Sequence, residues 1–410
     1  MRDKDLYARI LGLQSPWQVC RVELALSEGE VTVHVESEAG AAQSCPICGQ
    51  SCPGYDTRPR RWRHLDTCQY RTILMAKVPR VQCPAHGVRT VAVPWAESGG
   101  GFTALFEALV IDWLQAASIS AVSRQMQLSW NAIDGIMQRA VQRGLARREA
   151  VCPRHLGIDE TAFRKRHDYV TIVSDQQAGT VVHVGNDRKQ ETLKAWYEGL
   201  SEAQRNGIES VSMDMWPAFI NATLESLPGA GEKIAFDPFH VAQHLGKAVD
   251  QVRRQEHKAL MAEGREDLKG SKYDWLYNPQ NMTRQQQQRF QALRQSTLKT
   301  ARAWAIKELA RSLWHYTSRT WARKGWKRWL SWAARSRLAP VQAVARTIKK
   351  HLWGILNAVV RKVSNGPAEG LNSRIQTIKI RSRGFRNKQR FAHAIYFHLG
   401  GLDLYPKGVR

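Results

Sequence analysis

Residues 155–175 read HLGIDETAFRKRHDYVTIVSD, and this stretch decides how the larger part of the chain folds. Its two ends, HLGIDET at 155–161 and DYVTIVSD at 168–175, are rich in apolar and β-branched residues and flank a short basic segment. This pattern predicts two consecutive strands joined by a turn. The run GTVVHVG at 179–185 predicts a third strand directly after them.

Beyond this three-stranded start, the pattern alternates between helix and strand. A helix is expected over 189–200, a fourth strand within IESVSMDMW at 208–216, and a fifth strand that ends at Asp237. A further helix then begins through Phe239 and His240. Three antiparallel strands followed by alternating helices and strands are the ribonuclease-H-like arrangement, so we predict an α/β domain of this type.

Acidic residues on these strands indicate chemistry with a divalent metal. Asp159 lies in the middle of the first strand and Asp214 ends the fourth, so neighbouring strands would bring both carboxylates to one edge of the sheet. Asp237 is a rival for one of these positions, and we rank it as a strand-end residue because Asp214 fits the fourth strand better. His240 is expected to be a structural, hydrogen-bonding histidine. Two carboxylates hold a divalent cation poorly, so a third acid is expected.

The third acid has to come from the strongly basic C-terminal part of the chain. Residues 279–401 contain two acids, Glu308 and Glu369. Glu369 lies in NGPAEGLNSRIQTIKIRSRGFRN (365–387), and the predicted helix start is marked by Asn365, Gly366 and Pro367. One polar helix face then carries Glu369, Asn372, Gln376 and Lys379. We expect the carboxylate to face metal, and DNA phosphates to be bound by Lys379, Arg381, Arg383 and Arg386.

A pair of cysteine motifs near the N-terminus predicts a zinc site. Residues 45–49 read CPICG and residues 83–87 read CPAHG. In each motif, two other residues separate the two ligand side chains, and a glycine follows the second ligand. The predicted ligands are Cys45, Cys48, Cys83 and His86. Alternative ligands are Cys52, Cys68 and His64, and unligated buried thiols are the alternative to any metal. Four protein ligands would make this Zn²⁺ structural.

Residues 102–145 have the periodicity of three short helices. Ser118 or Ser120 can cap the second helix and Ser129 the third, and the short joint near Gln127 predicts a helix-turn-helix. A plain three-helix packing unit is the alternative. The exposed start of the recognition helix is expected to carry Trp130, Asn131 and Asp134. Its basic, phosphate-facing end would carry Arg139, Arg143, Arg147 and Arg148.

Between residues 240 and 365 the sequence predicts helices throughout, which would form an all-helical insertion. Six tryptophans fall within 304–332, interleaved with Lys and Arg. Most of them are expected to build the core of the insertion. Trp326 and Trp329 have basic neighbours, and we consider them candidates for stacking on unpaired DNA bases.

The charge of the chain requires a polyanionic partner. The 410 residues carry a formal net charge of +25, and 43% of them are hydrophobic, which excludes a wholly disordered basic protein. Residues 281–410 hold 28 Lys and Arg against 3 acids, whereas residues 1–280 are balanced. Interleaved Trp, Gln, Asn and His favour nucleic acid over an anionic membrane surface. We therefore expect DNA phosphates to lie along the C-terminal third, while the N-terminal modules select sequence.

Four motifs, in this order behind the CPICG module and the helix-turn-helix, carry a family resemblance. They are GIDETAFRKRHDYVTIVSD (157–175), VSMDMWPAFINA (211–222), AFDPFHVAQHL (235–245) and NGPAEGLNSRIQTIKIRSRGFRN (365–387). Together they closely resemble transposases of the ISL-three family of bacterial insertion sequences, over nearly the whole chain.

The resemblance implies an Asp-Asp-Glu triad at Asp159, Asp214 and Glu369. The family's D-x-F-H element corresponds to residues 237–240 and its G-x-R-N element to residues 384–387. His86 stands where many relatives are expected to have Cys. Such a triad would bind two Mg²⁺ or Mn²⁺ ions for in-line phosphoryl transfer without a covalent protein nucleophile. The enzyme would cleave the element's ends and join the 3′-hydroxyl to target DNA.

The implied partners are double-stranded DNA, both terminal inverted repeats and target, and a second copy of the chain in a homodimer. Neither a membrane nor a small-molecule substrate is expected, because the chain has no apolar run long enough for a span and its N-terminus lacks a signal-peptide core. We therefore expect a bacterial cytoplasmic protein at the nucleoid. Two alternatives are a metal-dependent nuclease of the same fold and a zinc and helix-turn-helix regulator.

The predicted fold class is multidomain α+β. Its five expected parts are a zinc-binding domain (1–98), a helix-turn-helix domain (99–150), the first part of the catalytic domain (151–250), the helical insertion (251–360) and the C-terminal part of the catalytic domain (361–410).

Overall fold

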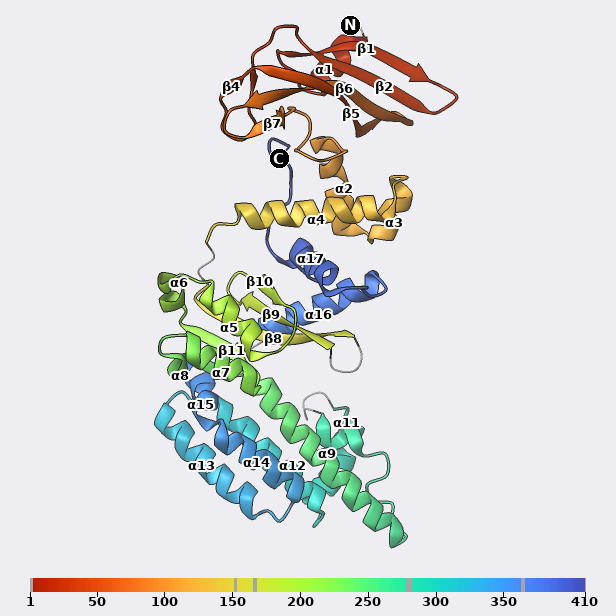
Figure 1. The fold of residues 1–410 in the computed structure, drawn as a ribbon. Helices are drawn as coiled ribbons and strands as arrows, with labels where there is room; N and C mark the ends of the chain where they lie inside the picture. The colour runs from red at the N-terminus through yellow and green to blue at the C-terminus, as the bar shows by residue number, and fades with distance from the viewer. Residues whose placement is uncertain (1–2, 151–152, 165–167, 278–281, 363–365, 410) are drawn as a thin grey trace. The chain divides into compact units, whose positions relative to one another are not determined.

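The computed structural model describes residues 3–150, 153–164, 168–277, 282–362 and 366–409 (Figure 1). The chain forms two compact units. Unit 1 consists of Met1–Glu149, Tyr396–His398 and Leu402–Arg410, and unit 2 consists of Ala150–Ile395 and Leu399–Gly401. None of the helices in the described residues is long and apolar enough to cross a membrane.

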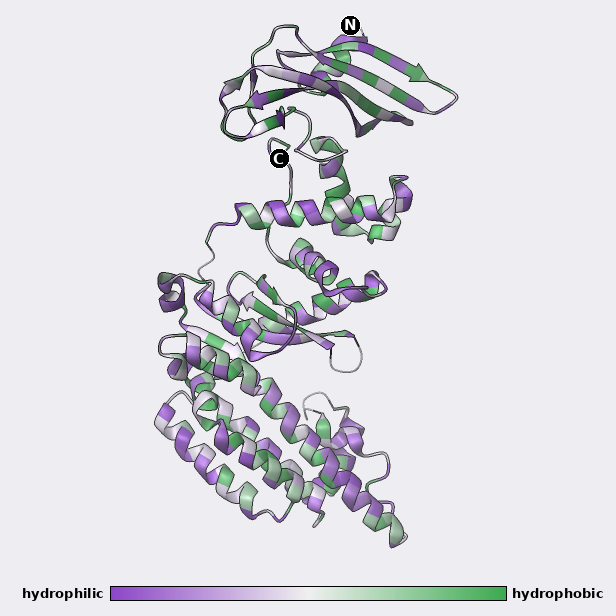
Figure 2. Cartoon of the chain, viewed as in Figure 1, coloured by the Kyte–Doolittle hydropathy of each residue, from purple (hydrophilic) through white to green (hydrophobic). Residues whose placement is uncertain are grey.

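Unit 1 begins with helix α1 (Asp3–Ile10) and a five-stranded sheet. The sheet has the order β1 (Trp17–Ala25), β2 (Glu30–Ser37), β6 (Tyr70–Cys83), β5 (Gly54–Thr67), and β7 (Gly87–Thr90) pairs with the end of β6. Hydrophobic and hydrophilic residues alternate along these strands, which is typical of a sheet with one buried face (Figure 2). Trp95 packs edge-on against both Trp17 and Trp62 in the core beneath the sheet.

The predicted helix-turn-helix is confirmed. Its helices are α2 (Ala104–Ala116), α3 (Ile119–Gln125) and α4 (Trp130–Arg147). Thr103, Ser118 and Ser129 are their N-caps, and each side chain accepts a hydrogen bond from the backbone N–H three residues later. Gln127 has φ +52° in the joint between α3 and α4, which lets the chain turn within four residues.

Two arginines at the basic end of α4 form ion pairs within unit 1, which the sequence did not predict. Arg139 pairs with the carboxylate of Glu107, which is 3% exposed. Arg143 donates to Glu107 Oε2 at 2.9 Å and also pairs with Glu97. A buried carboxylate that is not paired with a cation destabilises the folded state. The ion pairs of Arg139 and Arg143 with Glu107 avoid this cost. The Arg139 side chain is 33% exposed beside this ion pair, and its role as a DNA ligand stays a prediction.

The C-terminal tail also packs on α4. Arg143 Nη1 donates to the Leu404 carbonyl oxygen at 2.5 Å, and the Tyr405 hydroxyl donates to Asp112 Oδ1 at 2.7 Å. Leu404 is 4% exposed. Gly144 makes this approach possible, because a Cβ there would lie 2.7 Å from Leu402 Cβ and 3.1 Å from the Asp403 carbonyl oxygen. Residues 402–409 thus belong structurally to the helix-turn-helix unit.

Unit 2 is built on a sheet with the order β10-β9-β8-β11-β12. The strands are β8 (His155–Arg164), β9 (Asp168–Asp175), β10 (Thr180–Gly185), β11 (Ser210–Met213) and β12 (Ile234–Phe236). β10, β9 and β8 pair antiparallel, and β8, β11 and β12 pair parallel. Leu156 and Ile158 of β8 lie in one core with residues of α5 (Gln190–Glu198) and α7 (Pro217–Ser226).

The other face of β8 contacts α16 (Gly366–Arg381), since a Cβ on Gly157 would lie 3.3 Å from Ala368 Cβ. Asn365, which we expected at the start of this helix, lies outside the described residues. The remaining helices of the sheet region are α6 (Glu202–Gly207), α8 (Ala230–Lys233) and α17 (Lys388–Leu399). Side chains alternate along a strand, so Asp159 and Thr161 share the α16 face with Gly157.

Within residues 238–361, the part of the chain that the structure describes forms helices joined by turns and contains no strand. The elements are α9 (Pro238–Ala262), α10 (Lys272–Leu276), α11 (Arg284–Gln295), α12 (Lys299–Ser312), the 3₁₀ turn η2 (Leu313–His315), α13 (Arg319–Arg335), α14 (Ala339–Lys350) and α15 (Leu352–Arg361). This region shares one hydrophobic core with the sheet. Asn357 Nδ2 donates to the carbonyl oxygens of Ile234, at 2.7 Å, and Gly231, at 2.9 Å, and so fastens α15 to β12.

The prediction that Trp326 and Trp329 stack on DNA bases is wrong. Both side chains are 0% exposed, and their rings pack edge-to-face with centroids 5.5 Å apart. Trp329 Nε1 donates to the Ile306 carbonyl oxygen at 2.8 Å. The rings build the core of the helical region, because their spacing of three residues places both on the buried side of α13.

Two glycines of α4 give a matched test of the tail contact. Gly144→Ala should destabilise unit 1 by about 1–3 kcal/mol, since the new methyl group has no room against Leu402. Gly135→Ala should be neutral or stabilise by up to ~1 kcal/mol, because its Cβ would lie 3.6 Å from Arg139 Nη1, an ordinary van der Waals contact. Urea unfolding of the full chain measures both, and equal effects would contradict the packing of the tail on α4.

Candidate functional site

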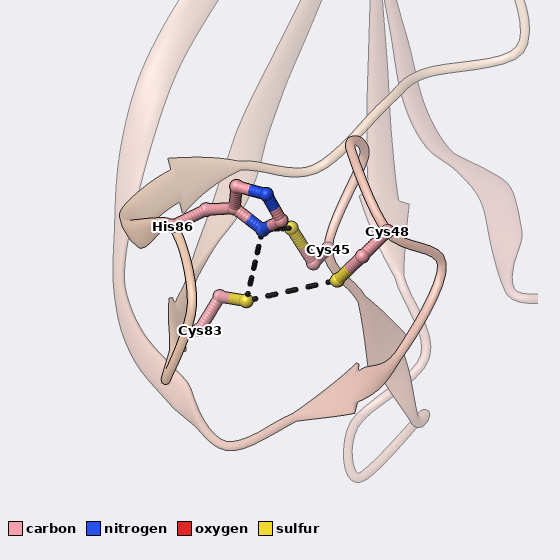
Figure 3. Close-up of side chains that lie close together, drawn as sticks. All are labelled: Cys45, Cys48, Cys83 and His86. Atoms are coloured by element: carbon pink, nitrogen blue, oxygen red, sulfur yellow. Dashed lines mark hydrogen bonds between the residues drawn. The ribbon is translucent and has the colours of Figure 1, made fainter.

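Four side chains of unit 1 converge as a metal site (Figure 3). Cys45 follows β3 (Gln43–Ser44), Cys48 lies in the turn before β4 (Ser51–Cys52), Cys83 ends β6 and His86 precedes β7. One ligand atom from each lies within 4.8 Å of all the others. The predicted ligand set is the one the structure assembles.

The distances fit a tetrahedral zinc ion. Cys48 Sγ lies 3.7 Å from Cys83 Sγ, and His86 Nδ1 lies 3.8 Å from Cys45 Sγ and 3.4 Å from Cys83 Sγ. Bonds of about 2.3 Å to sulfur and about 2.0 Å to nitrogen give tetrahedral edges of roughly 3.5–3.8 Å. With four protein ligands the ion would be structural.

Backbone amides prepare one of these thiols for metal. Burial alone would raise the pKa of Cys83, but the amides of His86 and Ala85, with the neighbouring thiols Cys45 and Cys48, outweigh it and lower that pKa to about 7. Thiolate is the form that binds zinc, so the lowered pKa favours the zinc-binding form of Cys83.

Two of the three alternative ligands, His64 and Cys68, lie away from the cluster, and Cys52 lies beside it, next to Cys83. His64 is 2% exposed, and its Nδ1 lies 2.9 Å from Thr103 Oγ1. Burial lowers the pKa of His64 to about 4, so it stays a neutral core residue. Cys68 is exposed at the β5–β6 turn, and the Cys52 thiol donates to the Gln50 carbonyl oxygen at 3.3 Å.

The second candidate site is the acidic edge of the unit 2 sheet. Asp159 lies on β8, Asp214 follows β11, Asp237 is the N-cap of α9 and Glu369 lies in the first turn of α16. Asp159 Oδ1 accepts from the Glu160 amide at 2.7 Å, and Asp214 Oδ1 accepts from the Met215 amide at 2.6 Å. These local bonds fix one oxygen of each aspartate.

A ladder of three hydrogen bonds docks α16 on β8. Asn372 Nδ2 donates to Asp159 Oδ2 at 2.6 Å, and Gln376 Nε2 donates to Thr161 Oγ1 at 2.8 Å. Lys379 Nζ donates to the Ala162 carbonyl oxygen at 2.7 Å. The polar face predicted for this helix exists, but it faces the strand. Lys379 therefore helps to anchor the helix, a contact the sequence did not predict, and its role as a phosphate ligand stays a prediction.

His240 lies among the acids. Its Nδ1 is 3.8 Å from Asp214 Oδ2, and its Nε2 is 3.9 Å from Asp237 Oδ2. Asp237 is 3% exposed and accepts from the Phe239 amide at the start of α9. A histidine between two carboxylates partly balances their charge when it is protonated.

Burial raises the pKa of two of the proposed catalytic acids. Desolvation raises the pKa of Asp159 to about 6, and the nearby carboxylates of Glu160 and Asp214 contribute to the increase. Burial and the charge of Asp237 raise the pKa of Glu369. Glu369 Oε1 is buried without a hydrogen-bond partner among the described residues. A nearby cation would favour the ionised form of both acids.

The acids share one edge but do not form as tight a donor set as the zinc ligands. Among the described residues, the Cys45 set is the only close cluster of three or more Cys, His, Asp or Glu ligand atoms. The Asn372 amide occupies the position beside Asp159 Oδ2. This amide contact and the hydroxyl of Thr161 were not foreseen as parts of the site. The available signal was the spacing of Asp159 and Thr161, which places both on the α16 face.

Several predicted DNA ligands remain accessible. Asn131 is exposed and Trp130 is half-buried at the start of α4, whereas Asp134 is 4% exposed and accepts from Gln138 Nε2 at 2.8 Å. The expectation that Asp134 is exposed is therefore wrong. On α16 and in the segment between α16 and α17, the exposed cations are Arg374, Arg381, Arg383 and Arg386.

A zinc-binding module, a helix-turn-helix and an acid-bearing α/β sheet in one chain define a DNA-binding protein with an enzymatic domain. Comparison with known families makes the class specific. Residues 156–395 match a transposase family of the ISL3 type, residues 91–141 match the helix-turn-helix domain of transposase family ISL3, and residues 41–86 match the zinc-finger of transposases IS204, IS1001, IS1096 and IS1165. The chain belongs to the ISL3 family of transposases.

Two curated relatives are similar in sequence over nearly their full length. The transposase for insertion sequence element IS1557 of Mycobacterium tuberculosis is 28% identical over 419 residues, which cover 95% of this chain and 94% of the relative. The transposase for insertion sequence element IS1001 of Bordetella parapertussis is 28% identical over 415 residues, with all of both chains covered.

Zinc content tests the first site. The purified chain should hold a single zinc ion at the Cys45 cluster, measured by elemental analysis. Cys48→Ser should lose that zinc and lower the unfolding temperature of unit 1, because metal affinity contributes to folding free energy. Cys68→Ser is the control and should keep the zinc. Zinc retained in the Cys48 variant and lost in the Cys68 variant would reverse the ligand assignment.

Proposed function

We propose that this transposase is of the Asp-Asp-Glu type, with Asp159, Asp214 and Glu369 as its catalytic acids. The observation that carries the proposal is the hydrogen bond from Asn372 to Asp159. Asn372 lies one helical turn after Glu369 on the same face of α16, so this bond brings the glutamate to the edge that holds both aspartates.

The sheet topology supports a ribonuclease-H-like catalytic domain. Three antiparallel strands are followed by two parallel ones, and Asp159 and Asp214 lie on neighbouring strands. The helices of residues 238–361 stand between β12 and α16 in sequence, which supports their interpretation as an insertion.

The donor chemistry of the three acids fits Mg²⁺ or Mn²⁺. Carboxylate oxygens are the ligands such hard cations prefer. Glu369 Oε1 is buried and has no hydrogen-bond partner among the described residues, and burial raises the pKa of Asp159, so a cation would favour the ionised form of both acids. When bound, two such ions would provide Lewis acidity for in-line phosphoryl transfer.

The protein side chains would then act by orientation and charge. Asn372 donates to Asp159 Oδ2 and the Glu160 amide donates to Oδ1, so hydrogen bonds to both oxygens orient this carboxylate. His240 offsets the charge of Asp214 and Asp237. Exposed Arg383 and Arg386 lie just after α16, where they can bind phosphates of the DNA strand at the acids.

Sequence recognition is assigned to the helix-turn-helix. Trp130 and Asn131 at the start of α4 would contact base edges of the terminal inverted repeat. Target DNA would be joined at the acids of unit 2. A homodimer, which can hold two DNA ends, and a location at the bacterial nucleoid are parts of the same proposal.

Amide variants test the triad. Asp159→Asn, Asp214→Asn and Glu369→Gln should each lower Mg²⁺-dependent cleavage of an inverted-repeat duplex by roughly 100-fold or more, because each removes several kcal/mol of transition-state stabilisation. DNA affinity should stay within about twofold, since these acids do not supply the electrostatic binding energy. Gel-shift and cleavage assays measure the two quantities.

Glu308→Gln is the control, because Glu308 is the other acid of the basic region and pairs with Lys307 and Arg311. Its cleavage rate should equal that of the wild type. Strand transfer with a pre-cut 3′-hydroxyl end should yield joined DNA. Cleavage without joining would make the protein a nuclease, and normal cleavage by the amide variants would refute the triad.

A further inference from the structure

A second polar network lies on the face of β8 opposite to α16. Because side chains alternate along a strand, Asp159 faces α16 and Glu160 faces the other way. Glu160 Oε1 accepts a hydrogen bond from Arg188 Nη1 at 2.9 Å. Arg188 lies in the connection between β10 and α5. The side chains of both residues are less than one-third exposed, at 25% and 29%.

Arg188 also contacts two aromatic rings. Its guanidinium carbon lies 4.3 Å from the ring centroid of Tyr169, on β9, and 4.5 Å from that of Trp216, the N-cap of α7. The Arg188 carbonyl oxygen accepts from Trp216 Nε1 at 3.2 Å. One arginine therefore joins β8, β9 and the segment after β11.

The residues that Arg188 holds are neighbours of the proposed acids. Glu160 directly follows Asp159, and Trp216 is two residues after Asp214. The strand pairing in the structure ends at Ile158 and Met213, one residue before each aspartate. Beyond that point no backbone hydrogen bond of the β8–β11 ladder fixes the distance between the two carboxylates. The Glu160–Arg188–Trp216 link spans this unpaired end.

We propose that Arg188 is a positioning residue that sets the separation of the Asp159 and Asp214 carboxylates, and with it the affinity of this edge for divalent cations. The inference rests on the proposed function, because it assumes that these two aspartates bind metal together. Arg188 acts through Glu160 and Trp216 and does not itself touch the reacting atoms.

The chemistry of the contact requires arginine. A planar guanidinium can donate to a carboxylate while its faces contact aromatic rings, whereas the lysine ammonium is a point charge that keeps only the ion pair. Arg188→Lys should therefore retain part of the effect and Arg188→Ala none. Glu160→Gln should weaken the link from the other side. A direct role for Arg188 in DNA binding is less favoured, because its charge is already paired with Glu160.

The test measures divalent-cation binding without DNA. Mn²⁺ should raise the unfolding temperature of the wild-type chain, and the Mn²⁺ concentration that gives half of this increase should be about 10-fold higher or more in Arg188→Ala, with a smaller increase in Arg188→Lys and Glu160→Gln. The Mg²⁺ requirement of cleavage should move in the same direction. Excess Mn²⁺ should restore part of the cleavage rate, and DNA affinity should stay within about twofold.

Arg154→Ala is the matched control. Arg154 Nε donates to Glu209 Oε1 at 2.7 Å, which links the same two strands at the end remote from the acids. Its Mn²⁺ midpoint should equal that of the wild type. Circular dichroism without metal checks that each variant folds, and the Lys and Gln variants carry the test if Arg188→Ala does not.

The outcomes separate the inference from the proposed function. If wild type shows no Mn²⁺ stabilisation and Asp159→Asn cleaves normally, the proposed function fails. If wild type responds to Mn²⁺ and the Arg188 variants respond at the same concentration, the inference is overturned while the proposed function stands. Loss of DNA affinity with an unchanged Mn²⁺ midpoint would also overturn it, by making Arg188 a DNA ligand.

Discussion

The bond between the Asn372 amide and Asp159 joins residues 213 positions apart in sequence, and the arrangement of unit 2 depends on it. The helical region leaves the sheet directly after β12 and returns to the same strand through Asn357 of α15, whose amide donates to the Ile234 carbonyl oxygen. Gly354 permits this return, because a Cβ there would lie 2.4 Å from the Phe236 ring. Because the helical region begins and ends beside β12, α16 can reach β8 after only a short connection from α15.

The buried carboxylates at the acidic edge of the unit 2 sheet destabilise the protein when they are ionised and no cation is bound. Buried carboxylates with raised pKa values at Asp159 and Glu369 cost free energy when ionised, and a single histidine, His240, offsets little of it. Of the two, the Asp159 carboxylate is held by hydrogen bonds from α16 and from its own strand before any ligand binds. Such a site gains most from cations and from the DNA phosphates that the basic segment after α16 can hold.

Sequence reasoning succeeded where a signal is local and failed where a partner is distant. Spacing and residue type within a few positions predict the strands, the helix caps Ser118 and Ser129, and the two cysteine motifs of the zinc site. The ion pair of Arg139 was not predicted because its partner Glu107 lies 32 residues earlier on another helix. Trp326 was misread because Trp between Lys and Arg at helical spacing fits either a core or a binding face. Lys379 was placed on the correct face, but the sequence could not show that β8 covers it.

Anomalous scattering from crystals of the full chain grown with Mn²⁺ tests the central claim most directly, because it locates the cation without relying on activity. The account predicts a peak within bonding distance of carboxylate oxygens from Asp159, Asp214 and Glu369. The hydrogen bond from Asn372 to Asp159 should remain in the same crystals. A peak held by Asp214 and Asp237 without Glu369 would contradict the account, since α16 would then lie on the sheet for packing alone.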